Sequence, residues 1–138
     1  MEVLYQRTLT KMINALNEMP VSSELRVLID NLLDQTRKFY NTNPMERALV
    51  LSPSTFVISI QTNSDYGKVL YQQLVNTVGL PKSRKLRQTC DIAIEITLVV
   101  WRKSYVEKGK VTAAFHTQAK RVVLPYFESA IEQPEHNN

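Results

Sequence analysis

No glycine or proline interrupts residues 82–108, a length that is typical of a helix and long for a strand. Apolar side chains recur there at helical spacing, at Leu86, Cys90, Ile94, Leu98, Trp101 and Tyr105. The run 91–100 also places an apolar residue at every second position, as a half-buried strand would. Arg87 and Asp91 stand four residues apart, a spacing that supports helices. The stretch therefore predicts a long helix, with a strand over 91–100 as the alternative.

Apolar periodicity predicts helices over most of the remaining chain. A helix that starts at Ser22 or Ser23, either of which could cap it, should pack antiparallel to the first helix, since neither can bury its apolar stripe alone. Gly79 and Gly109 are predicted helix ends, because glycine readily adopts the left-handed conformation found there. The predicted helices cover approximately residues 2–18, 22–40, 45–51, 65–78, 82–108 and 111–132.

Two places leave the local structure open. Residues 55–61 alternate like a strand, but Ser54 beside Pro53 could equally start a helix, which we prefer. Pro125 should kink or restart the last helix, because proline removes one backbone donor and crowds the preceding turn.

Glycine is rare in this sequence. Three glycines in 138 residues are too few for the turns of an all-β or Rossmann-like domain. Together with the helical patterns, this predicts an all-α fold, a single-domain bundle of about five helices over residues 1–132, followed by a polar tail over 133–138. An α+β fold with strands near 55–61 and 91–100 is the alternative.

Residue types that carry catalysis or bind metals are sparse. The single cysteine, Cys90, lies on the apolar stripe and predicts a buried side chain rather than a disulfide or a metal cluster. His116 is expected on the surface of the last helix or half-buried in it. Asp30 and Asp34 are expected on a solvated helix face, and an enzyme becomes the interpretation only if the fold brings them or His116 into one cleft. We therefore expect no enzymatic activity, no cofactor and no metal.

The chain shows no sign of a membrane or of export. No apolar run approaches the ~18–20 residues that a membrane span requires. The first residues lack the apolar core of a signal peptide. These observations predict a soluble, cytoplasmic protein without a membrane partner.

Positive charge is concentrated in one segment, residues 82–121. It holds ten of the seventeen Lys and Arg residues against three acidic ones, about +7 by side-chain counting. The first 81 residues are neutral and the last 17 carry −3, so the modest net charge of +4 hides a strong local one. The ten basic residues are Lys82, Arg84, Lys85, Arg87, Arg102, Lys103, Lys108, Lys110, Lys120 and Arg121.

This basic segment predicts a nucleic-acid-binding surface. If the last two helices pack as a hairpin, the ten residues could form one electropositive strip that contacts phosphates rather than base edges. The helix that starts near Lys82 would help, because the positive end of its dipole favours anions. We therefore predict a non-catalytic subunit that binds the RNA or DNA backbone without sequence preference. The alternative is a viral or bacterial adaptor whose basic face binds an acidic protein.

The order of these features resembles the small subunits of CRISPR interference complexes of the Cascade type. It is most similar to the helical C-terminal region of the type I-D large subunit, which is also made separately as a small subunit. The residues behind the resemblance are 35–53, a helical segment that leads into a loop, and 95–127, where a long helix, a basic glycine turn and a final basic helix follow one another. The resemblance implies an architectural role in a ribonucleoprotein, with self-association and other protein subunits as partners. Such copies would touch the guide–target duplex or the displaced strand, while base pairing reads the sequence.

Overall fold

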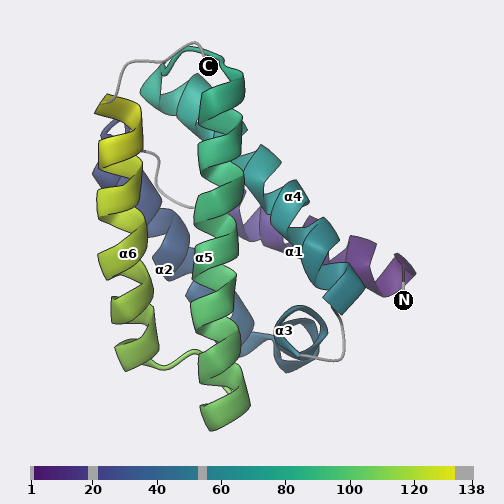
Figure 1. Cartoon of the computed structure of the whole chain (residues 1–138). Coiled ribbons are helices and arrows are strands. Elements are labelled where there is room, and N and C mark those ends of the chain that lie inside the picture. Colours follow the sequence, from purple (N-terminus) through teal and green to yellow (C-terminus); the bar gives the residue numbers. More distant parts are fainter. Residues whose placement is uncertain (1, 19–21, 53–55, 133–138) are drawn as a thin grey trace.

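Every regular element in the part of the chain that the computed structural model describes, residues 2–18, 22–52 and 56–132, is a helix (Figure 1). The predicted all-α fold is therefore confirmed, and both strand alternatives are wrong. Residues 56–61 lie in α4 and residues 91–100 lie in α5, while residue 55 lies outside the described residues, as does the tail. The elements are α1 (Glu2–Asn17), α2 (Leu25–Thr42), α3 (Pro44–Leu51), α4 (Phe56–Gln73), the π-helical turn η2 (Leu74–Val78), α5 (Arg84–Lys108) and α6 (Ala113–Glu132).

Helix α5 has a well-defined signal at each end. The side chain of Ser83 accepts a hydrogen bond from the backbone N–H of Leu86 at 3.0 Å, which is N-capping geometry. Gly109 has a φ of 75°, and its N–H donates to the carbonyl of Tyr105 at 2.8 Å, so the predicted helix end is confirmed. The apparent alternation over 92–100 follows the helix period instead: Leu98 is buried, whereas Ile92 is exposed.

Three other elements differ in detail from the sequence expectation. The N-cap of α2 is Glu24, without a side-chain hydrogen bond, and the Ser22 hydroxyl accepts from the Glu24 N–H at 3.2 Å, so neither serine caps the helix. The two helical patterns at 55–61 and 65–78 join into α4, which continues through η2 to Gly79. Helix α6 continues through Pro125 without a restart.

Helix α5 is the central element of the bundle (Figure 1). Helix α4 packs along one side and α6 returns antiparallel along the other, with α2 behind them. Helix α1 packs against α2, as the paired stripes predict, and also contacts α4. Side chains from all these helices share one core, whose largest fully buried members include Trp101, Tyr40 and Phe127. The Trp101 and Tyr40 rings meet edge-on at 6.1 Å.

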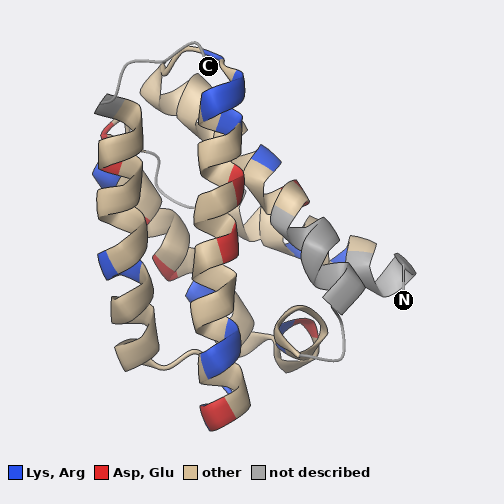
Figure 2. Cartoon of the chain, in the orientation of Figure 1, with Lys and Arg blue, Asp and Glu red and all other residues tan. Residues whose placement is uncertain are grey.

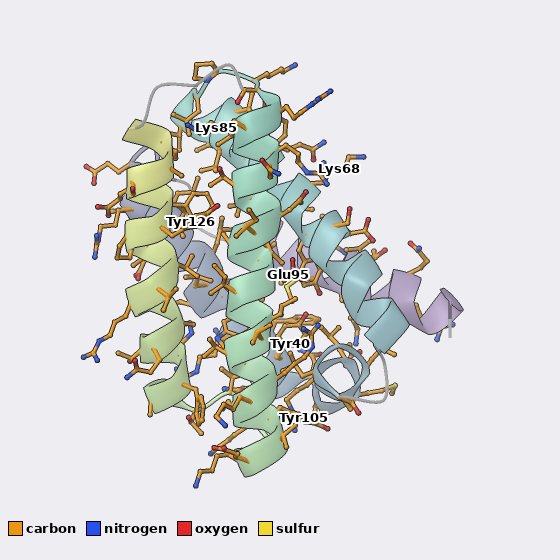
Figure 3. All side chains as sticks on the ribbon, viewed as in Figure 1. Tyr40, Lys68, Lys85, Glu95, Tyr105 and Tyr126 are labelled. Carbon is orange, nitrogen blue, oxygen red and sulfur yellow. The ribbon has the colours of Figure 1, made fainter. Side chains whose placement is uncertain are left out.

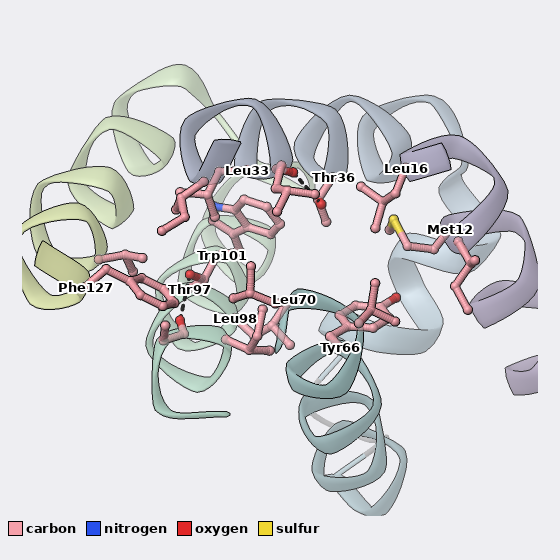
Figure 4. A pocket seen from close by; sticks show the side chains of 17 residues that line it. Met12, Leu16, Leu33, Thr36, Tyr66, Leu70, Thr97, Leu98, Trp101 and Phe127 are labelled. Atoms are coloured by element: carbon pink, nitrogen blue, oxygen red, sulfur yellow. Dashed lines mark hydrogen bonds between the residues drawn. The ribbon is translucent and has the colours of Figure 1, made fainter. Parts of the chain in front are cut away.

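A small apolar cavity remains where five helices meet (Figure 4). Its volume is about 60 Å³, and its walls include Met12 of α1, Leu33 of α2, Leu70 of α4, Leu98 of α5 and Phe127 of α6. Beside it, the hydroxyls of Tyr40 and Tyr66 hydrogen bond at 2.7 Å inside the core.

Among the described residues, none of the helices combines the length and the apolarity needed to span a lipid bilayer.

Candidate nucleic-acid interface

The ten predicted contact residues occupy three separate places on the fold. Four lie at the N-terminal end of α5, four lie at its C-terminal end and in the following turn, and two lie midway along α6 (Figure 2). At a rise of 1.5 Å per residue, Arg84 and Lys108 are about 36 Å apart along the helix. Asp91 and Glu95 lie between them on α5. The predicted hairpin forms, but the ten residues do not make one continuous strip.

The N-terminal end of α5 is the most open of the three places. We call Lys82, Arg84 and Lys85 the basic cap. Lys82 and Arg84 are exposed, Lys85 is half-buried, and the first turn of α5 contains no acidic residue. A surface hollow of about 290 Å³ lies beside it, and none of the described residues that line it carries a carboxylate. The hollow is lined by Leu80, Pro81, Lys82, Ser83, Lys85, Leu86 and Thr89, and by Ala130 and Ile131 of α6.

The basic cap is electrostatically suited to an anion. The first N–H groups of a helix lack intrahelical acceptors, and the helix dipole adds positive potential at the same end. Cations at this end of a helix interact unfavourably with its dipole, so a bound phosphate relieves an unfavourable interaction. Figure 3 shows Lys85 at this end of α5 and places Lys68, an exposed residue of α4, in the same half of the molecule.

Arg87 has a bracing role at the edge of this place. Its Nε donates to the Asp91 carboxylate at 3.2 Å, and its Nη2 donates to the Ser64 carbonyl at 2.9 Å. The predicted i, i+4 pair is therefore present, and the guanidinium links α5 to α4. Arg87 is less available for a phosphate than Lys82 or Arg84.

At the opposite end of α5, only part of the predicted charge faces solvent. Arg102 is half-buried, its Nε donates to the Val50 carbonyl at 3.4 Å, and burial lowers its pKa. Lys103 pairs with Glu107 at 3.0 Å on the exposed side of the helix. Lys108 and Lys110 are exposed and pair with no other described residue. These two lysines are the available cations of this end.

On α6, Lys120 is turned toward α2 and is already neutralised. Its Nζ lies 2.8 Å from an oxygen of Asp30 and 2.7 Å from one of Asp34. Burial disfavours its ammonium form, but hydrogen bonds to both carboxylates outweigh burial and raise its pKa. Because both carboxylates already hold its ammonium group, Lys120 is less available for a phosphate than an exposed, unpaired cation would be. Its neighbour Arg121 is exposed to solvent.

His116 belongs to the same cluster and is buried, with 5% of its surface exposed, contrary to the surface or half-buried position expected. Its Nε2 donates to the Asp34 carboxylate at 2.8 Å. Burial lowers the pKa of His116 more than Asp34 raises it, so the imidazole is neutral near pH 7. Burial also opposes ionisation of Asp34, but the hydrogen bonds from Lys120 and His116 lower its pKa overall.

The fold brings Asp30, Asp34 and His116 together, whereas the enzymatic interpretation required them to lie in one cleft. The cluster is poorly placed for substrate, because the His116 ring is buried and packs against Trp101 at a tilt of 43°, with centroids 5.6 Å apart. Neither the central cavity nor the hollow at the basic cap is lined by these residues. No group of three or more His, Cys, Asp or Glu among the described residues is placed to hold a metal ion.

The cluster therefore ties α2 to α6, and sequence reasoning missed it. A usable signal was present: Asp30 and Asp34 are four residues apart on one helix, and His116 and Lys120 are four residues apart on another. Residues four apart lie on the same face of a helix. Two carboxylates on one face can therefore meet two nitrogen-bearing side chains with the same spacing on the face of a packed helix.

Cys90 is buried as predicted, with none of its surface exposed. Burial, together with the nearby Asp91 charge, raises the pKa of its thiol to about 12, so the thiolate that a nucleophile needs does not form near neutral pH.

No protein-family model, curated protein or solved structure matches this chain.

Proposed function

We propose that this chain is a non-catalytic, sequence-independent subunit that binds a nucleic-acid backbone, with its main phosphate contacts at the basic cap. The observation that supports this most directly is the convergence of three features at one end of α5. Lys82, Arg84 and Lys85 surround the positive end of a 25-residue helix, beside a hollow whose described lining residues include no carboxylate. Such a place attracts phosphate without reading bases.

The other predicted contact residues have unequal parts in this proposal. Lys108, Lys110 and Arg121 are exposed and would add weaker phosphate contacts at a distance from the cap. Arg87, Arg102 and Lys120 would mainly hold the bundle together, because each is bound to other parts of the chain.

The resemblance to the small subunits of CRISPR interference complexes assigns the chain a place in a larger assembly. In that setting, several copies would line a ribonucleoprotein and contact the guide–target duplex or the displaced strand through phosphates. Genomic context tests this part of the proposal: the reading frame should lie in a CRISPR operon, or at an internal start within a large-subunit gene. A frame outside any such locus would remove the assignment and leave the binding proposal intact.

A salt series measures the proposed binding. Fluorescence anisotropy with a labelled 30-nucleotide single strand and with the matching duplex gives Kd between about 50 and 200 mM salt. The log Kd should rise steeply with log salt, by about 0.7 to 0.9 per phosphate neutralised. An absence of affinity for both probes at the lowest salt would contradict the proposal.

A matched pair of variants locates the site. Lys82→Ala/Arg84→Ala removes two exposed cations from the basic cap, and Arg7→Ala/Lys38→Ala removes two exposed cations elsewhere. Both change the net charge by the same amount, so a general charge effect would weaken binding equally. We expect the salt slope to fall by about 1.5 for the cap variant and to change little for the control.

The alternative function, an adaptor for an acidic protein, is separated by adding polyglutamate to the same measurement. If polyglutamate displaces the labelled strand at equal charge concentration, the basic cap binds acidic proteins. The same holds if the chain binds polyglutamate but has no affinity for nucleic acid. If it competes only weakly, the spacing of phosphates is what the cap recognises.

A further inference from the structure

The outward side of α5 carries apolar residues that no described part of the chain covers. Ile92, Val99 and Val106 are 39%, 59% and 62% exposed. They follow one another at intervals of seven residues, nearly two full helical turns, so they lie along one line of the helix. We call these three residues the apolar row. Exposed β-branched residues at this spacing are typical of the contact positions of paired helices. Val122, on the neighbouring α6, is also 50% exposed.

Two opposite charges are placed symmetrically within the row. Glu95, which Figure 3 labels, lies four residues before Val99, and Lys103 lies four residues after it; both side chains are exposed. Glu95 forms no hydrogen bond or ion pair with another described residue, although its charge acts on the half-buried Arg102, and Lys103 pairs with Glu107 of its own helix. Val99 is therefore the centre of a symmetric pattern on α5. Seven positions away on either side is an apolar residue, and four positions away is Glu95 on one side and Lys103 on the other.

We propose that a second copy of this chain packs antiparallel against α5, with a twofold axis that passes between the two Val99 side chains. In this arrangement Val99 meets its own counterpart, Ile92 meets Val106 of the second copy, and Glu95 meets Lys103. The last two contacts occur twice, as a twofold axis requires. Each flanking layer thus contains either two apolar side chains or one pair of opposite charges.

The charges of Glu95 and Lys103 favour a second copy as the partner and an antiparallel orientation of the two α5 helices. In a parallel pair in the same register, Glu95 would face Glu95 and Lys103 would face Lys103, and both contacts would be repulsive. Only the antiparallel arrangement satisfies both charges while keeping the apolar row continuous. A helix from another protein would need the same spacing by coincidence, whereas a second copy provides it by symmetry. The proposal does not depend on nucleic-acid binding.

Single cysteines test the twofold axis. Two helices 8–10 Å apart bring the residues on the axis to Cα separations of about 4–6 Å, which suits a disulfide. Residue 106 is seven positions away, so its two copies would be about 21 Å apart and could not react with each other. The native Cys90 is fully buried, so it does not interfere.

We expect Val99→Cys to form a disulfide-linked dimer in mild oxidant, and Val106→Cys, at a position just as exposed, to remain monomeric on a non-reducing gel. The double variant Ile92→Cys/Val106→Cys should form the dimer again, because it places one cysteine from each copy in the same layer. Equal cross-linking of Val99→Cys and Val106→Cys, or no cross-linking of either, would overturn the antiparallel arrangement.

A charge exchange tests the same contact without a covalent bond. Sedimentation equilibrium over a range of concentrations gives the dimer Kd of the full chain. Glu95→Lys and Lys103→Glu should each weaken the dimer at least about tenfold, because each single change creates two repulsive pairs. The double variant Glu95→Lys/Lys103→Glu should restore the wild-type Kd within about threefold. Far-UV circular dichroism checks that each variant is folded.

Failure of the double variant to recover would overturn the proposal. A wild-type chain that stays monomeric at the highest concentration, or one that dimerises with a Kd that Val99→Asp does not alter, would also overturn it and would leave the apolar row to a different protein. Met45→Asp, which alters an equally exposed apolar residue on α3, is the matched control and should leave the Kd unchanged.

Discussion

At the scale of single residues, the Asp34–His116–Lys120 cluster shows how burial decides protonation. His116 is enclosed between α2 and α6 and stays neutral because burial outweighs its hydrogen bond to Asp34. The charges that face it are Asp34, which favours protonation, and Lys120 and Arg37, which oppose it. The cluster should therefore make the stability of the bundle depend on pH.

The pKa of His116 is lower in the folded chain than in the unfolded chain, so below pH 6.5 the unfolded state binds the proton first and stability falls. We expect the urea midpoint of the wild-type chain to be lower at pH 5.5 than at pH 7.5. His116→Gln keeps a donor for Asp34 but does not titrate, so the difference should largely disappear. An unchanged pH dependence in the variant would show that another group is responsible, since His136 is present in both chains.

At the scale of the elements, α5 is defined by its ends and by a close approach to α4. Its long apolar stripe makes it the centre of the core, while Ser83 fixes where it begins and therefore which residues form the basic cap. Gly67 allows α4 to approach closely, because an added Cβ there would lie 1.9 Å from Asp91 Oδ1 and 3.2 Å from its Cα.

Removing the cap of α5 should cost stability. Ser83→Ala deletes the oxygen that accepts the Leu86 N–H, and such caps contribute about 1 kcal/mol. Ser23→Ala is the matched control, since Ser23 is exposed, lies outside α2 and is not its N-cap. Urea unfolding should show a loss for Ser83→Ala and a change under about 0.5 kcal/mol for Ser23→Ala. Equal effects would mean that the capping bond does not stabilise α5.

Gly67→Ala tests the contact between α4 and α5. In an open helix the change would stabilise by about 1 kcal/mol, but here we expect a net loss of about 1–2 kcal/mol because the methyl group overlaps Asp91. Asp91→Ala in the same chain should recover part of the loss, since the remaining overlap is with backbone. Stabilisation by Gly67→Ala alone would show that the helices can separate freely.

At the scale of the whole molecule, the bundle has one core, and its central cavity lies where α1, α2, α4, α5 and α6 meet. Leu98 is 2% exposed and lines this cavity, whereas its neighbour Val99 is 59% exposed on the outward side of α5. Of these two adjacent residues, Leu98 therefore contributes to the core, and Val99 belongs to the proposed dimer contact.

Leu98→Ala should destabilise the chain by about 3–5 kcal/mol, because it enlarges a cavity whose walls come from five helices and cannot collapse easily. Val99→Ala should change the unfolding free energy of the monomer by less than about 0.5 kcal/mol. Chemical denaturation at low protein concentration measures both without a contribution from association. A small effect of Leu98→Ala would mean that the core can repack around the missing side chain.

The sequence by itself determined the helices and the location of the charge. The 3.6-residue period, Gly79 and Gly109 act locally, so they could be recognised from neighbouring residues, and the unbroken stripe from Leu86 to Tyr105 correctly outweighed the alternation over 92–100. The tertiary structure decided which cations remain available. Lys120 is neutralised by Asp30 and Asp34, which lie more than 80 residues away along the chain. Arg102 is half-buried where it hydrogen bonds to the Val50 carbonyl. Such pairings depend on which helix faces meet, and helix periodicity does not specify that.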